Sequence, residues 1–350
     1  MKSRLITTLA FAGATALLLA GCGSTASGGG EGGGESAAEL DHVTVQLDYV
    51  PRGNHAMFFV GQEKGFFEEE GIVVDDIIKG TGSPDAMRIV GGGQADFGFG
   101  DLPTLATARS QGVEVTALAA VNQTSPLAMC GLSEKHDLQT AADLKGLNIG
   151  VHPAGSTYIF WQALLAANNL TAADVTELTV TPPYESYLLT GNVDAIICYI
   201  DAEVPELEAK AGGPGSLSVM LGSENGYDVY GSGMFTSSKL LAEDPDLVER
   251  FTRAYIKSFQ YVIDNPQEAA EIVAASAPEL ADKAEVFQEQ LQADIDHTFE
   301  SDLTAELGLG AMSEEVWQTT IDVLSKQGVI EQAPDVNDVF DSSFVEKAHQ

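Results

Sequence analysis

The sequence predicts an α/β fold of two lobes, with a ligand cleft between the lobes and a helical C-terminal part. Three observations support this fold class. Short β-rich segments alternate with helical ones from residue 42, the alternation restarts after Pro126, and the last third carries apolar residues at helical spacing. Alternating strands and helices are typical of a parallel sheet with helices on both faces. Two such alternations therefore predict two sheets.

The individual elements follow from local patterns. Ser83 suits a helix N-cap and Pro84 the first helical position, while the three glycines at 91–93 end that helix. In the first half we expect strands at 43–47, 72–78, 95–99 and 113–121, and helices at 54–70, 84–90 and 102–110. In the second half we expect strands at 127–132, 147–151, 177–181 and 195–199, and helices at 141–144, 158–168 and 184–189.

Four helices are expected in the last third, at 245–263, 266–275, 283–296 and 314–327. Pro245 and Pro266 begin the first two, and Asp244 and Asn265 before them are natural N-caps. These helices account for the helical C-terminal part of the fold.

Residues 1–21 are predicted to be a lipoprotein signal peptide. Lys2 and Arg4 precede an apolar stretch at 5–20, an order typical of secretory signals, and the stretch is short for a membrane-spanning anchor. The stretch ends in LAGC at 19–22, which resembles the bacterial lipobox. That resemblance implies cleavage before Cys22 and attachment of diacylglycerol to its thiol.

A tether is expected at 22–41, beginning with the lipidated Cys22. The segment is rich in Gly and Ser, so it cannot form a core and reaches about 20 Å by random-coil scaling. Two acyl chains suffice for stable anchoring. We therefore expect a body held at the outer, extracytoplasmic face of the cell membrane.

The charge balance argues against polyanionic partners. The chain has 17 Lys and Arg against 52 Asp and Glu, a formal net charge of −35. Nucleic-acid binding and adhesion to anionic lipid both depend on Lys and Arg. We expect no nucleic-acid partner.

No catalytic, metal or cofactor signature is found. The sequence has no P-loop, zinc-protease or nucleophile-elbow motif, and its six His residues have no metal-ligand spacing. Cys130 and Cys198 lie in apolar runs, which favours buried free thiols, with a single disulfide as the alternative. We therefore expect no catalytic residue, metal or cofactor.

Polar residues at the ends of predicted strands are the candidate ligand contacts. Ligands of open α/β sheets bind at the carboxyl ends of the strands. Each loop alone is equally well explained as a helix cap, since Ser83, Asp101 and Ser156 all suit an N-cap. Four loops at equivalent positions nevertheless favour a shared cleft. Tyrosines in a cleft can stack on a planar ligand, and glutamates can accept hydrogen bonds from an amino group. The candidates are Asp48, Asn54, His55, Ser83, Asp101, Gly155, Ser156, Thr157, Tyr184, Glu185, Tyr199 and Glu203.

Several motifs resemble one family of binding proteins. They are QLDYVP at 46–51 with NHA at 54–56, QEKGFFEEEGI at 62–72, AMRIVGGGQADFGFG at 86–100, ADLKGLNIGV at 142–151 and GNVDA at 191–195. Together they resemble solute-binding proteins of ABC importers. The most similar branch is the thiamine-pyrimidine-precursor (hydroxymethylpyrimidine synthase-like) group, related to nitrate, sulfonate and taurine binders.

This resemblance implies a type II periplasmic-binding-protein-like fold whose lobes close on one small molecule. We place lobe 1 at 42–125 plus 235–345 and lobe 2 at 126–234. The implied partners are ABC permease subunits with a cytoplasmic ATPase, and we expect a monomer that is not an enzyme. Some fungal relatives are enzymes that use a His at the position of His55 and carry a Cys-rich motif. This chain has no such Cys cluster.

The ligand class is predicted from charge. The candidate loops bring Asp48, Asp101, Glu185 and Glu203 against a single cation, Arg52. Carboxylates facing an anion would oppose its binding, so we expect a small nitrogenous heterocycle such as a thiamine pyrimidine precursor. The alternative is a sulfonate, taurine or nitrate held at helix N-termini. A pyrimidine-synthase-like enzyme is the less favoured function, and a solute-sensing partner of a membrane receptor also stays open.

Overall fold

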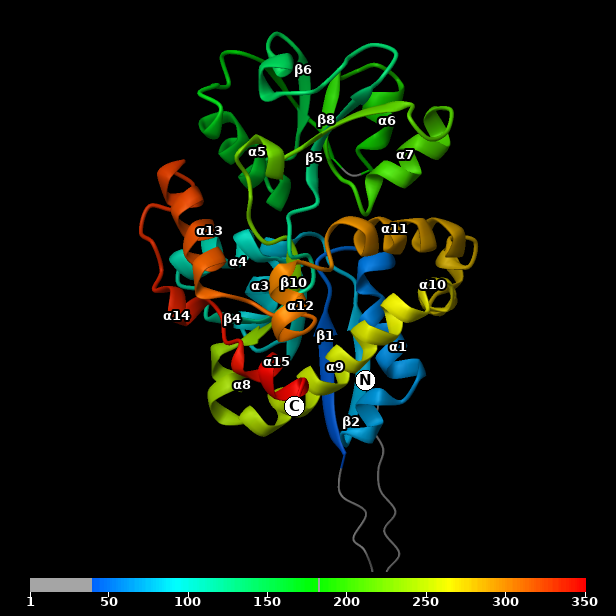
Figure 1. Cartoon of the computed structure of the whole chain (residues 1–350), viewed down its shortest axis with the longest axis vertical. Helices are drawn as coiled ribbons and strands as arrows, with labels where there is room; N and C mark the ends of the chain where they lie inside the picture. Colours follow the sequence, from blue (N-terminus) through cyan, green and yellow to red (C-terminus); the bar gives the residue numbers. More distant parts are fainter. Residues whose placement is uncertain (1–39, 182) are drawn as a thin grey trace, which may run out of the picture. The chain divides into compact units, whose positions relative to one another are not determined.

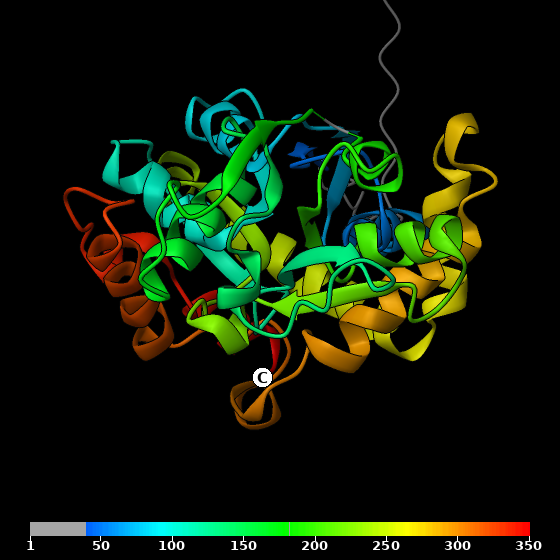
Figure 2. The ribbon, with the colours of Figure 1, turned by 90° about the horizontal axis from the view of Figure 1, so that it is seen from above.

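The computed structural model describes residues 40–181 and 183–350. The predicted signal peptide, Cys22 and nearly all of the tether lie outside the described residues. Two five-stranded sheets form two lobes, one above the other in Figure 1. Figure 2 shows the same arrangement from above.

The lower lobe contains the sheet with strand order β2-β1-β3-β10-β4. Its strands are β1 (Asp41–Gln46), β2 (Ile72–Ile78), β3 (Phe97–Asp101), β4 (Val115–Ala120) and β10 (Ser232–Ser237). The first helices packed around it are η1 (Gly53–His55), α1 (Ala56–Glu63), α2 (Phe66–Glu69), α3 (Ser83–Gly91) and α4 (Leu102–Ser110).

The upper lobe contains the sheet with strand order β7-β6-β8-β5-β9. Its strands are β5 (Leu127–Leu132), β6 (Asn148–Val151), β7 (Thr176–Thr179), β8 (Ala195–Tyr199) and β9 (Leu217–Leu221). Its helices are η2 (Ala141–Leu144), α5 (Ser156–Ala167), α6 (Glu185–Leu189), α7 (Glu203–Ala211) and η3 (Ser223–Asn225).

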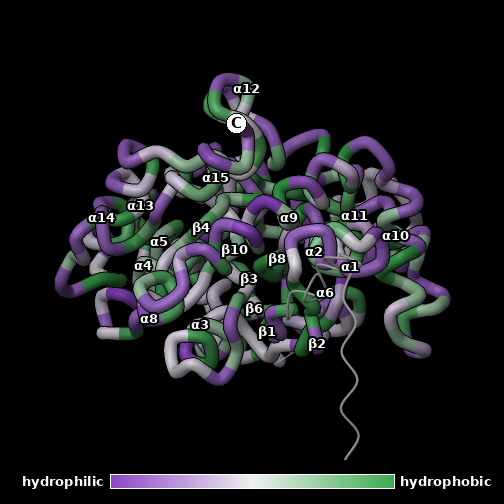
Figure 3. Tube along the Cα trace, turned by 90° about the horizontal axis from the view of Figure 1, so that it is seen from below, coloured by the Kyte–Doolittle hydropathy of each residue, from purple (hydrophilic) through white to green (hydrophobic). Residues whose placement is uncertain are grey.

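The C-terminal part is helical, as expected, and covers the lower sheet (Figure 1). The ring of Phe251 stacks on Phe97 of β3 with centroids 3.6 Å apart. Apolar segments lie mainly inside and hydrophilic ones mainly at the periphery (Figure 3). The helices are α8 (Ser238–Glu243), α9 (Pro245–Asp264), α10 (Pro266–Ala275), η4 (Pro278–Leu280), α11 (Ala284–His297), α12 (Asp302–Leu307), α13 (Glu314–Lys326), α14 (Val336–Val339) and α15 (Ser343–Ala348).

Both sheets are mixed, which corrects the expectation of parallel sheets. β10 runs antiparallel to β3 and β4, and β5 runs antiparallel to β8 and β9. The reason is that β5 and β10 each enter a sheet directly from the other lobe. A strand that begins at the cleft edge must run opposite to strands that end there.

The two crossings between the lobes lie side by side. Gly231 N donates to Asn122 O at 2.9 Å, and Ser125 N donates to Val229 O at 2.8 Å. These backbone hydrogen bonds join the segment after β4 to the segment before β10. The paired segments form the hinge.

Other expected elements also need correction. The helix expected at 54–70 is broken at Gly65, whose φ of 73° is left-handed and separates α1 from α2. No element was placed at 200–244, so the structure adds five unexpected elements there: α7, β9, η3, β10 and α8. Asn265 precedes α10 as expected, but its side chain donates to Tyr261 O instead of capping the helix.

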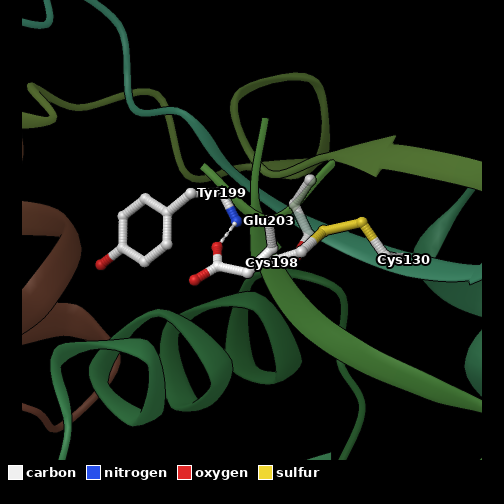
Figure 4. Close-up of a disulfide and its surroundings, with 5 residues drawn as sticks. Cys130, Cys198, Tyr199 and Glu203 are labelled. Atoms are coloured by element: carbon white, nitrogen blue, oxygen red, sulfur yellow. Dashed lines mark hydrogen bonds between the residues drawn. A yellow bond between two sulfur atoms is a disulfide. The ribbon is translucent and has the colours of Figure 1, made fainter. Parts of the chain in front are cut away.

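Cys130 and Cys198 form a disulfide, so the favoured expectation of free thiols was wrong (Figure 4). Cys130 lies opposite Ile196 in the antiparallel pair of β5 and β8, and Cys198 lies opposite Ala128. The two cysteines are therefore diagonal neighbours on one face of the sheet, with Cα atoms 6.0 Å apart. Their separation of 68 residues hides this proximity in the sequence.

No helix in the described part of the chain has both the length and the apolar character needed to cross a bilayer.

Candidate functional site

Two adjoining cavities lie between the lobes, with volumes of about 180 and 50 Å³. The residues that line both are Tyr49, Arg52, Tyr184 and Glu203. The first two follow β1 in the lower lobe, whereas the other two border α6 and α7 in the upper lobe. Together the cavities form one cleft whose walls come from both lobes, as the fold class predicts.

Asp48 is the central acid of the lower wall. Its Oδ1 lies 2.9 Å from His55 Nε2. Its Oδ2 accepts from Ser83 Oγ at 3.4 Å and lies 3.6 Å from Arg52 Nη2. Burial alone would raise the Asp48 pKa, but the His55 hydrogen bond and the Arg52 charge together hold that pKa below its usual value. Asp48 is therefore an ionised carboxylate whose partners are already in place.

Arg52 occupies the centre of the cleft. Its guanidinium carbon lies 5.3 Å from the ring centroid of Tyr199 and 5.9 Å from that of Tyr49. Its Nε donates to Asn54 Oδ1 at 3.2 Å. Burial opposes the charge, but Asp48 and other nearby carboxylates raise the Arg52 pKa. The positive charge of Arg52 is therefore already largely balanced by the Asp48 carboxylate and the two tyrosine rings.

The N-terminus of α5 forms part of the upper wall. Ser156 Oγ lies 3.0 Å from the hydroxyl oxygen of Tyr199, at the end of β8. The expectation that Ser156 caps this helix was wrong, because Gly155 occupies the N-cap and Ser156 is already helical. The Ser156 hydroxyl instead joins the α5 terminus to the tyrosine ring.

Ser83, in the lower wall, also does not occupy the N-cap expected for it. Gly82 precedes α3 as its N-cap residue, and the Ser83 hydroxyl points to other loops. It accepts from Asp101 N at 3.1 Å while donating to Asp48. Asp101 does cap α4, as predicted, by accepting from Thr104 N at 2.9 Å. The Asp101 carboxylate thus serves its own helix.

The upper wall also supplies acidic side chains. Glu203 Oε2 accepts from Tyr199 N at 2.9 Å, and burial raises the Glu203 pKa to about 7 (Figure 4). Glu185 is 9% exposed, and its Oε2 receives no hydrogen bond from any described residue. Its Oε1 lies 3.9 Å from Lys210 Nζ. Glu185 thus lines the larger cavity, and its Oε2 is buried without a partner among the described residues.

Most of the predicted site residues converge on this cleft. Glu185 lines the larger cavity, while Asn54, His55 and Asp101 line neither and are buried behind its walls. The smaller cavity is lined by Asp48, Ser83, Gly155, Ser156, Thr157, Tyr184, Tyr199 and Glu203. Which of these residues contact a ligand stays a prediction.

Sequence reasoning missed several lining residues. Tyr49 lies in the same loop as Asp48, and His152 directly follows β6. Both could have been identified, because ligands of open α/β sheets bind at the carboxyl ends of strands. Lys283, Phe287 and Gln290 come from α11 and its start, and no local signal in the sequence links them to the cleft. Lys283 also adds a second cation, with its Nζ 3.6 Å from Glu206 Oε1.

No group of three or more potential metal ligands occurs within 40–181 and 183–350.

Comparison with known proteins decides the family. A family model described as NMT1/THI5 like matches residues 52–269, more than half of the chain. The chain belongs to the NMT1/THI5-like family. The family resemblance inferred from the sequence motifs is thereby confirmed.

Two related binding proteins align with most of this chain, and a related synthase aligns with about two thirds of it. The riboflavin-binding protein RibY of Chloroflexus aurantiacus is 25% identical, over 87% of this chain and 86% of its own. A formylaminopyrimidine-binding protein of Halalkalibacterium halodurans is 25% identical, over 87% and 90%. The 4-amino-5-hydroxymethyl-2-methylpyrimidine phosphate synthase THI13 of Saccharomyces cerevisiae is 27% identical, over 65% and 69%. The proteins to which this chain is similar therefore include named binding proteins and named synthases.

Solved structures support the fold. The aliphatic sulphonate-binding protein SsuA of Escherichia coli has a TM-score of 0.65 at 12% identity, covering 85% of this chain and 91% of its own. The nitrate-binding protein NrtA of Synechocystis has a TM-score of 0.64 at 15% identity, covering 89% of each chain. At these identities the likeness confirms the periplasmic-binding-protein fold alone.

Proposed function

We propose that this protein is the extracytoplasmic solute-binding component of an ABC importer. It captures a small nitrogenous heterocycle of the thiamine-pyrimidine-precursor kind by closing its cleft, and it delivers that ligand to the permease. The observation that carries this proposal is an inter-lobe cleft lined by tyrosine rings and by carboxylates, among them Glu185 and Glu203.

The charges of the cleft favour an amino-substituted ring over an anion. Asp48 holds Arg52, and Lys283 lies beside Glu206, so both cations of the cleft face carboxylates. An incoming sulfonate or nitrate would have to displace those carboxylates or be buried beside Glu185, at a cost in binding free energy. An exocyclic amino group would instead donate to such acceptors while its ring stacks on tyrosine.

Cavity size favours a single ring. Volumes of about 180 and 50 Å³ lie below the roughly 300–1,000 Å³ typical of drug-sized ligands. A pyrimidine of the kind named for the Halalkalibacterium relative fits this space better than a tricyclic flavin. We therefore place formylaminopyrimidine-type compounds ahead of riboflavin.

Binding without turnover fits the position of His55. The yeast and Legionella relatives are named as synthases, and an enzyme of that kind would need a reactive group in contact with its ligand. His55 is fully buried, hydrogen-bonds Asp48 and lines neither cavity. We infer a binder that returns its ligand unchanged.

The membrane attachment completes the proposal. Residues 1–21 would direct export, the thiol of Cys22 would carry the lipid, and residues 22–41 would hold the monomeric body near permease subunits with a cytoplasmic ATPase. The proposed lobes are 42–125 plus 235–345 and 126–234. Radiolabelled palmitate incorporation that disappears in Cys22→Ala would support the anchor, and unchanged incorporation would contradict it.

A thermal-shift screen of the purified protein tests the ligand class. The panel contains formylaminopyrimidine, hydroxymethylpyrimidine, thiamine, riboflavin, taurine, alkanesulfonates and nitrate. A ligand at about one hundred times its Kd adds about 2.7 kcal/mol of stability, a readily measured rise in Tm. A shift with a pyrimidine supports the proposal, whereas a shift with a sulfonate or nitrate alone would replace it with the anion-binding alternative.

Two variants then test the acidic wall. Glu185→Ala removes a carboxylate from the wall of the larger cavity and should weaken pyrimidine binding about tenfold. Glu177→Ala removes an acid that lines neither cavity and should leave pyrimidine binding unchanged. Equal binding by wild type and Glu185→Ala would refute the role assigned to this carboxylate.

A further inference from the structure

Two buried carboxylates meet at the junction of the lobes. Asp201 lies between β8 and α7, Asp294 lies on α11, and both are fully buried. Figure 1 shows α11 along the top of the lower lobe, next to α7. One turn before Asp294, Gln290 Nε2 donates to Ala202 O at 3.1 Å, directly after Asp201 in the chain. The two carboxyl groups lie close enough for each to shift the pKa of the other. A hydrogen bond between them needs a proton, because two ionised carboxylates offer acceptors only.

Each carboxyl group has one oxygen without a donor. Asp201 Oδ1 and Asp294 Oδ2 are buried and accept no hydrogen bond from another residue that the structure describes. Leaving both oxygens ionised and unpaired would carry a large desolvation penalty. One proton shared by the two oxygens would remove that penalty, since it leaves one acid and one carboxylate.

Asp294 is tied to the hinge. Its Oδ1 accepts from Asn122 Nδ2 and from Thr298 Oγ1, both at 2.6 Å. Asn122 Oδ1 in turn accepts from Ser232 N at 3.1 Å. Asn122 lies in one crossing and Ser232 begins β10 at the end of the other, so the orientation of Asp294 is coupled to both.

Asp201 is tied to the cleft. Its Oδ2 accepts from Asn54 Nδ2 at 3.3 Å, and Asn54 Oδ1 accepts from Arg52 Nε at 3.2 Å. Arg52 lines both cavities. A continuous chain of hydrogen bonds thus joins the hinge, the acid pair and the wall of the cleft.

Charged groups around Asp201 and Asp294 do not offset the effect of their burial. Burial raises the pKa of both carboxyls, and the positive charge of Arg52 opposes that rise. Glu203, at the start of α7, adds a further acid facing Asp201. The remaining contacts, from Asn54, Asn122 and Thr298, are uncharged.

We propose that Asp201 and Asp294 form a proton-dependent latch, so that closure of the cleft takes up one proton from solvent and opening releases it. In an open cleft the two side chains separate into water and both ionise near neutral pH. In the closed cleft they share one proton. Falling pH therefore favours the closed state. The latch deepens the proposed function, on which it rests because it requires lobes that open and close.

Calorimetry with formylaminopyrimidine measures the proton directly. Titrations in buffers of different ionisation enthalpy should show uptake of about one proton per ligand at pH 8, and Kd should rise up to tenfold per pH unit there. Asp294→Asn should abolish the uptake and flatten this pH dependence, because its amide can donate to Asp201 without a proton. Asp201→Asn serves the same purpose if the first variant does not fold, and Asp335→Asn, on an exposed loop, is the control.

Small-angle scattering of the ligand-free protein separates this inference from the ligand assignment. The wild type should be more compact at pH 5 than at pH 8, whereas Asp294→Asn should be equally compact at both. If no tested ligand binds, the proposed function fails while the scattering comparison still judges the latch. The latch would be refuted if the compactness of the wild type and of both variants changed with pH in the same way. It would also be refuted if proton uptake on ligand binding were unchanged in the variants.

Discussion

His55 Nε2 lies 2.9 Å from Asp48 Oδ1, and its Nδ1 accepts the backbone N–H of Arg52 at 3.3 Å. The ring proton therefore resides on Nε2 and is donated to Asp48. Burial lowers the His55 pKa, which keeps the imidazole neutral. His55 is a positioning residue: it orients the carboxylate that in turn holds Arg52 in the cleft.

His55 variants should separate positioning from chemistry. His55→Gln keeps an N–H donor and should retain ligand affinity within about threefold. His55→Ala leaves Asp48 short of a buried partner and should weaken binding about tenfold and destabilise the fold by about 3 kcal/mol. Isothermal titration and urea unfolding measure both effects. Equal loss of binding in both variants would instead indicate direct contact between the imidazole and the ligand.

Arg52→Lys should not behave as a conservative change. A lysine keeps the charge but loses the planar group that lies over Tyr199 and donates to Asn54. We expect about tenfold weaker ligand binding and a loss of about 1 kcal/mol in unfolding free energy. Arg88→Lys is the matched control, since Arg88 pairs with Asp85 on an exposed helix face and should change stability by less than about 0.5 kcal/mol. Equal effects of the two substitutions would contradict this role.

The buried Asp101 should make the free energy of unfolding depend on pH between about pH 4 and pH 7. Burial raises its pKa to about 7 in the folded protein, against 3.8 for the unmodified side chain. Since the folded pKa is the higher one, the contribution of Asp101 is fully present below pH 4 and is lost as pH rises to about 7. Asp101→Asn keeps the cap on α4 and should gain up to about 3 kcal/mol over the wild type between pH 5 and 8.

Asp143→Asn is the control for that titration. Asp143 is exposed and accepts three hydrogen bonds at the start of η2, which lower its pKa. Its contribution is lost as pH falls, so this variant should alter only the acid limb of the stability curve. Guanidinium unfolding at each pH provides the measurement. If the stability of Asp101→Asn changes between pH 5 and 8 as much as that of the wild type, a group other than Asp101 causes that change.

The disulfide should stabilise the upper lobe. It joins residues 68 positions apart, so the chain-entropy relation assigns it about 4 kcal/mol. Cys198 immediately precedes Tyr199 of the cleft wall, so reduction should lower both Tm and ligand affinity. A thiol titration of the denatured protein should detect Cys130 and Cys198 only after reductant is added. The double variant Cys130→Ser/Cys198→Ser should match the reduced protein, and an unchanged Tm would refute the stabilising role.

Local signals in the sequence placed many elements well. α4 begins and ends where predicted, because Asp101 caps it, Pro103 lies in its first turn and Gly112 follows its end. β5 and β8 also match their predicted bounds, since each is a fully buried apolar run. By contrast, β10 has the sequence SGMFTS, whose small and polar residues suit a strand only between β3 and β4. Its burial is a property of the assembled sheet.

The sequence by itself determined the α/β class, the two lobes, the loops that end at the cleft and the acidic character of the cleft walls. These depend on local periodicity, capping and residue type, which act within a few positions along the chain. Only the tertiary structure decided that Cys130 joins Cys198, that α11 contributes Gln290 and Lys283 to the cleft, and that Asp201 meets Asp294. Each of these relationships joins residues far apart in the chain, and their proximity arises only when both lobes and the hinge have packed.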